Sequence, residues 1–237
     1  MISDKKGKEC YVKPIREEKN YRFTIKQGKP KNLNEIRKGT KIGRGAIFAC
    51  IMCGETITSK YIKEKSMKQE LHSRLMASVA KGENGLVYVA PTSEMEEIAH
   101  KAEPRWIPEQ EMNRDTRDLV SGRGYGFFQW ADLFTSRQLV ALSTFSDLLE
   151  EVRKEIVKDA KSLHRTHDLT NVNDYAKAVS VYLAFAIDKC ADYWNAVATW
   201  MPRGTVGHLF SKQAIGMTWD YPEANPFANF HCSWENA

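Results

Sequence analysis

The sequence predicts an α+β fold in which a small β-rich segment precedes a mainly α-helical body. Short runs of β-branched and aromatic residues, separated by glycine- and proline-containing turns, fill the first sixty residues. Two later segments instead repeat apolar residues at steps of three and four, which predicts two long amphipathic helices. At 237 residues the chain can bury one sizeable core, and no apolar run approaches the length of a membrane span.

Residues 1–60 have the pattern of half a zinc ribbon. The runs CYVKPI and YRFTIK predict strands, and FACIMCGETI then predicts a strand, a tight turn and a second strand. Cys50 and Cys53 have the spacing of a metal-binding knuckle. Gly54 lets the backbone fold so that its amide groups face the thiolates. We therefore expect Cys50 and Cys53 to be zinc ligands.

The other half of a four-ligand zinc site is not evident in the sequence. The five cysteines occupy positions 10, 50, 53, 190 and 232, and a single pair has the Cys-x-x-Cys spacing. If the chain completes the site itself, Cys10 is the first candidate. A redox motif would need a strand that leads into a helix, whereas the residues after Cys53 favour a strand. Two unligated thiols in a turn are the remaining alternative.

The sequence of residues 61–128 predicts a connector that contains both helix and strand. Residues 61–80 carry apolar side chains at helical spacing and predict a helix. The run NGLVYVAP predicts a strand, and TSEMEEIAHKAEP predicts a short helix that begins with acidic residues. A proline-containing loop follows. The Gly-x-Gly-x-Gly run at 122–126 neither follows a clear strand nor begins a helix, so we interpret it as a turn and not as a nucleotide-binding loop.

Residues 129–204 predict a helical hairpin. Apolar stripes run along residues 135–160 and 173–200. The first of these helices begins with Thr135 and Gln138, which have the spacing of a capping box. A short polar link joins the two segments, so we expect antiparallel neighbours.

Two further features of this hairpin can be predicted. Cys190 lies on the apolar face of the second helix and is expected in the core between the helices. Pro202 and Gly204 are expected to end that helix. Residues 205–237 then form a loop-like tail that is rich in aromatic residues and proline. Such stretches are usually functional or buried against a larger part of the protein.

The distribution of charge favours a nucleic-acid partner. The net charge is +5, but residues 1–68 hold 18 Lys or Arg against 7 Asp or Glu, whereas the remainder is acidic. A basic third on an acidic body is a plausible DNA-binding surface. The candidate contacts are the four basic residues that precede the knuckle, namely Arg37, Lys38, Lys41 and Arg44. The alternative is that these side chains serve solubility alone.

The cysteine content indicates a reducing compartment. Five cysteines form no disulfide framework, and the amino-terminal residues lack the apolar stretch of a secretory signal. We therefore expect a cytoplasmic protein without a membrane partner.

Four stretches together resemble one known family. They are KGKECYVKPI, ACIMCGETI, YGFFQWADLFTSRQLVALSTFSDLL and QAIGMTWDYPEANPF. Their order along the chain and their residues are similar to those of the large adenine-specific DNA methylases that carry an inserted zinc ribbon. Some of these methylases are encoded near phage-defence genes. The resemblance covers nearly the whole chain. The run NPF at 225–227 also resembles, with one proline missing, the loop by which amino methyltransferases grip an amino nitrogen.

The resemblance implies a place for this chain in a longer protein. In that family the S-adenosylmethionine motif and the first cysteine pair lie upstream of the matched segment, and the Asp-Pro-Pro-Tyr catalytic motif lies downstream. The chain is therefore expected to be the middle of a methylase, with DNA and the remaining segments of the methylase as partners. S-adenosylmethionine is expected only in the full-length protein. The tail residues Asp220, Glu223 and Asn225 belong to the resemblance without an assigned role.

Two other functions fit the same residues. A stand-alone zinc-ribbon adaptor would use the knuckle and the basic residues to bind nucleic acid or a protein without catalysis. A structural remnant would have no activity of its own.

Overall fold

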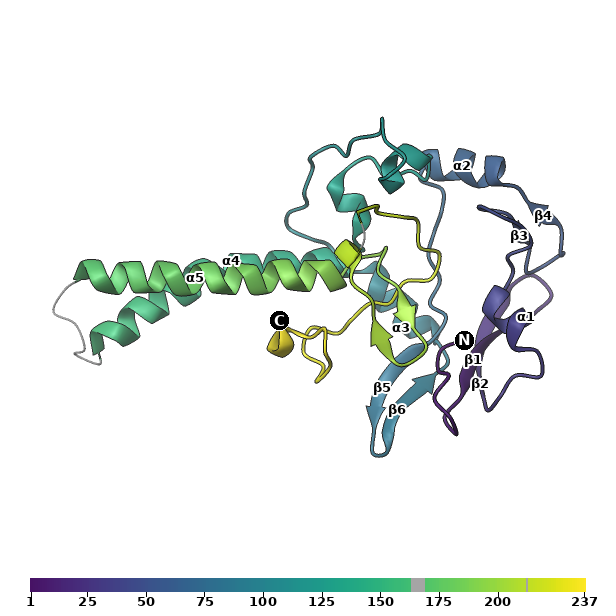
Figure 1. Ribbon diagram of the computed structural model, residues 1–237, viewed down its shortest axis with the longest axis horizontal. Helices are drawn as coiled ribbons and strands as arrows, with labels where there is room; N and C mark the ends of the chain where they lie inside the picture. The colour runs from purple at the N-terminus through teal and green to yellow at the C-terminus, as the bar shows by residue number, and fades with distance from the viewer. Residues whose placement is uncertain (163–168, 212) are drawn as a thin grey trace.

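The computed structural model describes residues 1–162, 169–211 and 213–237, and it confirms the α+β class. Figure 1 shows a body of small hairpins, short helices and loops, from which the two longest helices project together. We call this pair of helices the arm and the rest of the chain the body. Every sheet in the described residues has two strands, and these pair in antiparallel fashion.

The body begins with the two predicted strands, β1 (Cys10–Arg16) and β2 (Tyr21–Gln27), which pair as an antiparallel hairpin. A short helix that the sequence analysis did not predict follows, α1 (Leu33–Lys38). It begins at Asn32, whose side-chain oxygen accepts a hydrogen bond from the backbone N–H of Glu35. Asparagine is favoured at this position because it satisfies a backbone donor that the first helical turn leaves unpaired.

The cysteine pair lies between two very short strands, as predicted. These are β3 (Phe48–Ala49) and β4 (Thr56–Ile57), which pair in antiparallel fashion. Helix α2 (Ser59–Met67) begins directly afterwards, and the Thr58 hydroxyl accepts a hydrogen bond from a backbone N–H in its first turn.

The prediction of one helix over residues 61–80 is wrong in its second half. Helix α2 ends at Met67, and residues 78–82 form β5 (Ser78–Gly82), which pairs with β6 (Gly85–Val89). The backbone of Gln69 has φ = 55°, which is incompatible with continuation of the helix. Strand pairing, which places Val79 opposite Tyr88, outweighs the weak helical pattern because a β-branched residue packs well in a strand.

The connector continues as predicted. The strand over NGLVYVAP is β6, and the predicted short helix is α3 (Ser93–His100), capped by the Thr92 hydroxyl. An irregular segment then carries two short 3₁₀ helices, Val120–Arg123 and Trp130–Leu133. The glycine-rich run begins inside the first of these helices, at Gly122, and continues as a turn to Gly126.

The arm confirms the predicted antiparallel helical hairpin. It consists of α4 (Ser136–Ser162) and α5 (Leu169–Tyr193), which lie side by side (Figure 1). The capping box is present, since the Thr135 N–H donates to Gln138 Oε1 at 2.9 Å and the Gln138 N–H donates to Thr135 Oγ1 at 3.3 Å. The predicted link between the helices lies partly at residues 163–168, outside the described residues.

Helix α5 differs from the predicted range 173–200 at both ends. It begins at Leu169 and ends at Tyr193. The buried side-chain amide of Asn195 donates to the carbonyls of Ala191 and Asp192, at 3.0 and 2.9 Å, and so ends the helix. This side chain competes with the backbone for the last carbonyl groups of the helix.

Pro202 and Gly204, which we expected to end the helix, instead lie in a hairpin turn. The turn joins β7 (Trp200–Met201) to β8 (Thr205–Val206). Gly204 has φ = 86° there, a conformation that glycine adopts without strain. Cys190 is 2% exposed, so its predicted burial is confirmed, but its neighbours include Cys232 of the tail, which the prediction of a place between the two helices did not foresee.

Part of the tail packs against the base of the arm. The Trp194 indole N–H donates to the Cys232 carbonyl at 2.7 Å. The ring of Trp234, in the 3₁₀ helix Trp234–Asn236, stacks on Phe145 of α4 with centroids 4.4 Å apart. A further 3₁₀ turn, Leu209–Ser211, lies between β8 and the rest of the tail.

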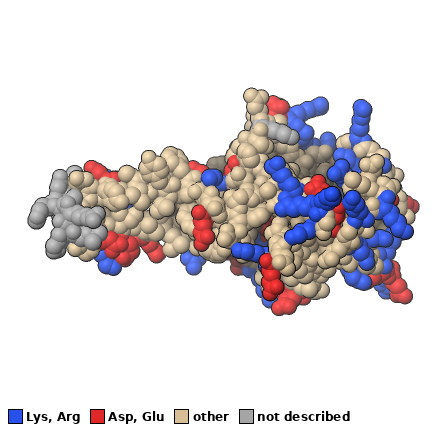
Figure 2. All heavy atoms as spheres, turned by 60° about the horizontal axis from the view of Figure 1, so that its bottom comes forward, with Lys and Arg blue, Asp and Glu red and all other residues tan. Residues whose placement is uncertain are grey.

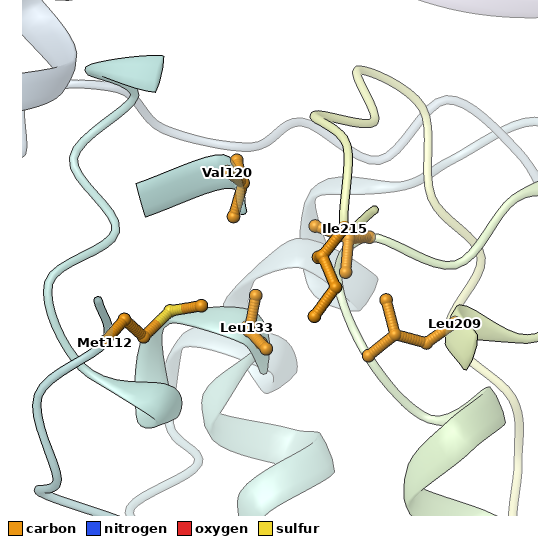
Figure 3. Close-up of a cluster of buried hydrophobic side chains, with 6 residues drawn as sticks. Met112, Val120, Leu133, Leu209 and Ile215 are labelled. Atoms are coloured by element: carbon orange, nitrogen blue, oxygen red, sulfur yellow. The ribbon is translucent and has the colours of Figure 1, made fainter. Parts of the chain in front are cut away.

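Irregular segments supply most of the principal core of the body. Figure 3 shows their side chains converging, and the labelled members are Met112, Val120, Leu133, Leu209 and Ile215. The first three precede the arm in the sequence, and the last two follow it. Burial of each such side chain contributes about 1.5–3 kcal/mol, so this core holds the connector and the tail together across the base of the arm. Among the described residues, no helix combines the length and apolarity that crossing a membrane requires.

Candidate functional site

The cysteine pair sits at the tip of the β3–β4 hairpin, which we call the knuckle. Two backbone hydrogen bonds close the turn, from the Cys50 N–H to the Glu55 carbonyl at 2.8 Å and from the Gly54 N–H to the Cys50 carbonyl at 2.9 Å. Gly54 has φ = 80°, the left-handed conformation that the sequence pattern predicts. Cys50 is half-buried and Cys53 is exposed, so solvent and metal ions can reach the pair.

The turn favours the ionised form of Cys50. Backbone N–H groups of Cys53 and Met52 donate hydrogen bonds to the Cys50 sulfur, and they lower the pKa of this thiol. Hydrogen bonds to a charged form stabilise it relative to the neutral form. Because the thiolate and not the thiol binds metals, this turn suits a metal ligand.

No third ligand joins this pair within the part of the chain that the structure describes. No cluster of three or more His, Cys, Asp or Glu side chains suited to a metal ion occurs there. Cys10, the first candidate for a further ligand, is buried in β1, and burial raises the pKa of its thiol. Burial likewise raises the pKa of Cys190 and of Cys232 to about 11, so these thiols stay protonated. Among the described residues, Cys50 and Cys53 are therefore an accessible pair of thiols without a third metal-binding side chain beside them.

The four candidate DNA contacts are all exposed and lie on the segment that leads into the knuckle. Arg37 and Lys38 occupy the last turn of α1, and Arg37 lies 4.0 Å from the Asp4 carboxylate. Lys41 lies opposite Phe48 in an isolated bridge, and backbone hydrogen bonds on both sides of it fold residues 40–49 into a hairpin. Arg44 lies in the turn of that hairpin. The site therefore places these cations along one continuous approach to the knuckle.

Figure 2 shows the wider electrostatic setting of these residues. On the face drawn there, Lys and Arg side chains gather over the body, whereas the arm carries many uncharged and acidic groups. This agrees with the excess of basic residues among positions 1–68. A cationic surface attracts polyanions over a range of about 8–10 Å at moderate salt.

An aromatic row, which the sequence analysis did not predict, joins the tail to the knuckle. The Trp219 ring lies edge-on to Phe48 of β3, with centroids 5.1 Å apart, and edge-on to Tyr125 at 5.5 Å. The Lys63 ammonium of α2 lies 5.7 Å from the centre of the Tyr125 ring. The only sequence signal for this row is the aromatic content of the tail, which does not reveal the partners of any one ring.

The tail residues of unassigned role make contacts within the protein. Glu223 forms an ion pair with Arg137, in the first turn of α4. Asp220 is exposed at the residue level, yet the surrounding protein desolvates its carboxyl group and raises its pKa, an effect that the positive amino-terminal group partly offsets. Asn225 Oδ1 accepts a hydrogen bond from the Phe227 N–H at 3.0 Å. Glu223 therefore links the tail to α4, and Asn225 stabilises a turn within the tail.

The NPF run contains the two kinds of hydrogen-bond acceptor that a base-gripping loop uses, and both are bonded within the protein. Asn225 Oδ1 is bonded as described, and the Pro226 carbonyl accepts a hydrogen bond from the Trp234 N–H at 2.8 Å. A loop that grips an amino nitrogen uses these two kinds of acceptor. In this structure they instead stabilise the turn that carries Phe227, which is exposed.

The site as a whole offers a pair of thiols suited to a soft metal and a row of cations suited to phosphate groups. Compared with known proteins, the chain matches no family model, no curated protein and no solved structure.

Proposed function

We propose that this chain is the middle segment of an S-adenosylmethionine-dependent, adenine-specific DNA methylase, and that it contacts DNA. In this role Cys50 and Cys53 supply half of a zinc ribbon, and another segment of the same protein supplies the other half. The basic approach to the knuckle contacts DNA phosphates. S-adenosylmethionine, which supplies the methyl group when bound, is held by other segments of the protein.

The observation that carries the proposal is the joint placement of thiols and cations. The thiol of Cys50 has a lowered pKa in a tight turn, and Lys41 and Arg44 are exposed on the hairpin that leads directly into it. Zinc ribbons and related small metal modules fold when the metal is bound, because the thiolates close the hairpin. Bound zinc would thus hold the cations in a defined position for phosphate contacts.

The tail supports the same proposal. The stretch that contains MTWDYPEANPF and the stretch that contains the knuckle both carry the family resemblance. They are far apart in the sequence, yet Trp219 packs against Phe48, directly before the knuckle. A tail that leads toward a catalytic loop would in this way be positioned relative to the DNA-contacting segment.

Phosphate contacts would serve methyl transfer by holding the duplex. A methylase must extrude its target adenine from the stack, at a cost of a few kcal/mol. Cations that bind the backbone beside the target base keep the DNA in register during this step. Such contacts supply affinity that depends on salt but carry no sequence information.

DNA binding by the chain tests the proposal. We expect a Kd of about 10⁻⁴–10⁻⁶ M for duplex DNA at physiological salt, which weakens steeply as salt rises. One variant reverses the charge of the candidate contacts, Arg37, Lys38, Lys41 and Arg44. A control variant applies the same change in net charge elsewhere, at Arg105, Arg153, Lys154 and Lys158. Fluorescence anisotropy over a salt series measures both.

The expected result is loss of binding in the first variant and retention in the control. Each phosphate contact adds about −0.9 to the slope of log K against log salt. The slope measured for the wild-type chain therefore estimates the number of phosphate contacts. Equal effects of the two variants, or binding that salt does not weaken, would overturn the role of the basic approach. DNA binding together with stoichiometric, chelator-resistant zinc would favour the stand-alone adaptor.

A further inference from the structure

Helix α5 exposes a row of large apolar side chains on the outside of the arm. Val181, Tyr182 and Phe185 are 51%, 76% and 61% exposed, and the rings of Tyr182 and Phe185 lie edge-on with centroids 6.5 Å apart. A helix of a soluble protein normally presents polar residues to solvent. An exposed cluster of this kind, in the middle of a projecting helix, is typical of an interaction surface.

These side chains belong to one narrow stripe. At 3.6 residues per turn, the residues that share this face of α5 lie within about 50° of its centre line. Eight residues of α5 lie there. Asp192, near the carboxyl end of the helix, is partly buried, and the other seven are exposed, namely Asn171, Asp174, Ala178, Val181, Tyr182, Phe185 and Lys189. The opposite face contains the buried residues Val172, Ala176, Ile187 and Cys190. The stripe therefore points away from the core of the arm.

The composition of the stripe is complementary to itself when it is reversed about its midpoint, which lies between Val181 and Tyr182. Ala178 and Phe185 lie at equal distances from that point, so a small residue matches a large one. Asp174 and Lys189 also lie at equal distances, so an anion matches a cation. This is the relation that a two-fold axis requires of an interface between identical surfaces.

We propose that a second copy of this chain docks on the stripe, with the two α5 helices antiparallel and related by a two-fold axis between Val181 and Tyr182. Phe185 of each copy then fills the space above Ala178 of the other. Asp174 of each copy lies opposite Lys189 of the other. Val181 meets its own counterpart at the axis, as Tyr182 does on the other side.

The edges of the stripe fit the same arrangement. Lys177 and Asp188 lie on one side of the stripe, and the two-fold axis brings Lys177 of one copy beside Asp188 of the other. Within one chain, Lys177 lies 3.3 Å from Asp174, and the Lys189 ammonium donates to the Asn236 carbonyl at 3.2 Å. Both contacts are exposed, so these flexible side chains can add a partner across the interface.

The arrangement has the anatomy of a protein interface. Aromatic anchors, Tyr182 and Phe185 from each copy, occupy the centre, where most binding energy arises, and charged pairs form the rim. The arm projects from the body (Figure 1), so a second helix can lie along it. A helix of 25 residues is about 37 Å long, and the antiparallel arrangement places the two bodies at opposite ends of the paired arms.

Sedimentation velocity over a range of protein concentrations tests the proposal, with a chelator present so that the knuckle cannot link two chains through a metal. The wild-type chain should reach a dimer as the concentration rises. Asp174→Lys and Lys189→Glu should each raise the dimer Kd on the order of tenfold, because each places like charges opposite one another twice. The double variant Asp174→Lys/Lys189→Glu should restore association. Lys154→Glu, on an exposed position of α4, is the matched control.

A crosslink locates the axis. In a chain whose accessible cysteines are removed, Cys50→Ser/Cys53→Ser, the substitution Val181→Cys should give a disulfide-linked dimer on oxidation with copper phenanthroline in air. Lys154→Cys in the same background should not. A chain that remains monomeric at all concentrations overturns the proposal and leaves the stripe to a different partner. Failure of the double charge variant to associate, while the wild type does, overturns the antiparallel register.

Discussion

The indole ring of Trp219 lies edge-on to the ring of Phe48, with centroids 5.1 Å apart, and this contact joins the tail to the strand that leads into the knuckle. Edge-on aromatic pairs contribute about 0.5–1.5 kcal/mol beyond the area they bury. The same indole also meets Tyr125, so one side chain connects the tail, the knuckle and the glycine-rich turn.

Replacing this ring should loosen all three segments. We expect Trp219→Ala to lower the free energy of unfolding by about 2 kcal/mol, less than a fully buried tryptophan would cost, because Trp219 is 39% exposed. Trp106→Ala is the matched control, since Trp106 is 62% exposed and should cost little. Urea unfolding measures both, and equal midpoints for the two variants would contradict the importance of the Trp219 contacts.

The thiol of Cys50 should react at lower pH than an ordinary cysteine. Its pKa is lowered by the amide groups of the turn, so the thiolate is present above the lowered value and is lost as the pH falls through it. Cys190 and Cys232, with pKa values of about 11, should resist alkylation at pH 9 in the folded chain. Iodoacetamide labelling followed by mass spectrometry gives the order in which the cysteines react. Labelling of Cys190 before Cys50 would contradict this assignment.

Zinc should bind to the knuckle of the isolated chain, but weakly. Two thiolates are half the ligand set of a structural site, whose apparent binding free energy is roughly 10–16 kcal/mol. A chelator should therefore remove the metal readily, and Cys50→Ser or Cys53→Ser should abolish binding. Cys10→Ser should leave the zinc affinity unchanged, because Cys10 is buried in β1. Stoichiometric zinc that resists chelators and requires Cys10 would show that the site is complete within the chain.

Gly126 should be irreplaceable where Gly124 is not. Both residues have φ = 76°, so alanine is strained to a similar degree at either position. A Cβ atom at Gly126 would lie 2.1 Å from the Ser66 carbonyl oxygen, at the end of α2, whereas at Gly124 the nearest atom is in the flexible Lys63 side chain at 3.6 Å. We expect Gly126→Ala to destabilise the chain by at least about 2 kcal/mol more than Gly124→Ala does. Thermal unfolding compares them, and similar Tm values would refute this tight packing.

The isolated chain should not transfer methyl groups. The cofactor's sulfonium must be held against an amino nitrogen, which requires a cofactor pocket and a base-gripping loop together. Every strand pair in the described residues is antiparallel, so the parallel strand–loop–helix unit of a cofactor fold is not among them. We expect no S-adenosylmethionine binding by calorimetry and no labelled methyl group on adenine-containing DNA. Robust methylation would refute the assignment of this chain as a middle segment.

Several local features followed from the sequence because their causes lie within a few residues. The Thr135–Gln138 capping box forms because each side chain reaches a backbone donor three positions away. The knuckle turn forms because Gly54 adopts a left-handed conformation directly after Cys53. The burial of Leu139 in α4 and of Cys190 in α5 followed from helical periodicity, which indicates which side of a helix faces the protein, although Val152 on the predicted apolar face of α4 is 38% exposed.

Tertiary contacts decided what the local pattern left open. Val79 lies in a strand because β6 is available to pair with it, although its spacing from earlier apolar residues also fits a helix. Helix α5 ends at Tyr193 because the buried Asn195 amide binds the last carbonyls, whereas the apolar pattern alone continues to Trp200.

In the candidate site, too, some features could be predicted from the sequence and others depended on tertiary contacts. The residue types and the spacing of Cys50 and Cys53 were enough to predict the shape of the turn. The contact of Trp219 with Phe48 could not be predicted, since it depends on how the connector and tail close around a shared core. The sequence by itself therefore determined the start of α4 and the turn of the knuckle, because hydrogen bonds within a few residues specify them. Only the tertiary structure decided where competing local patterns end and which distant rings meet, because those outcomes depend on burial shared between segments far apart in the chain.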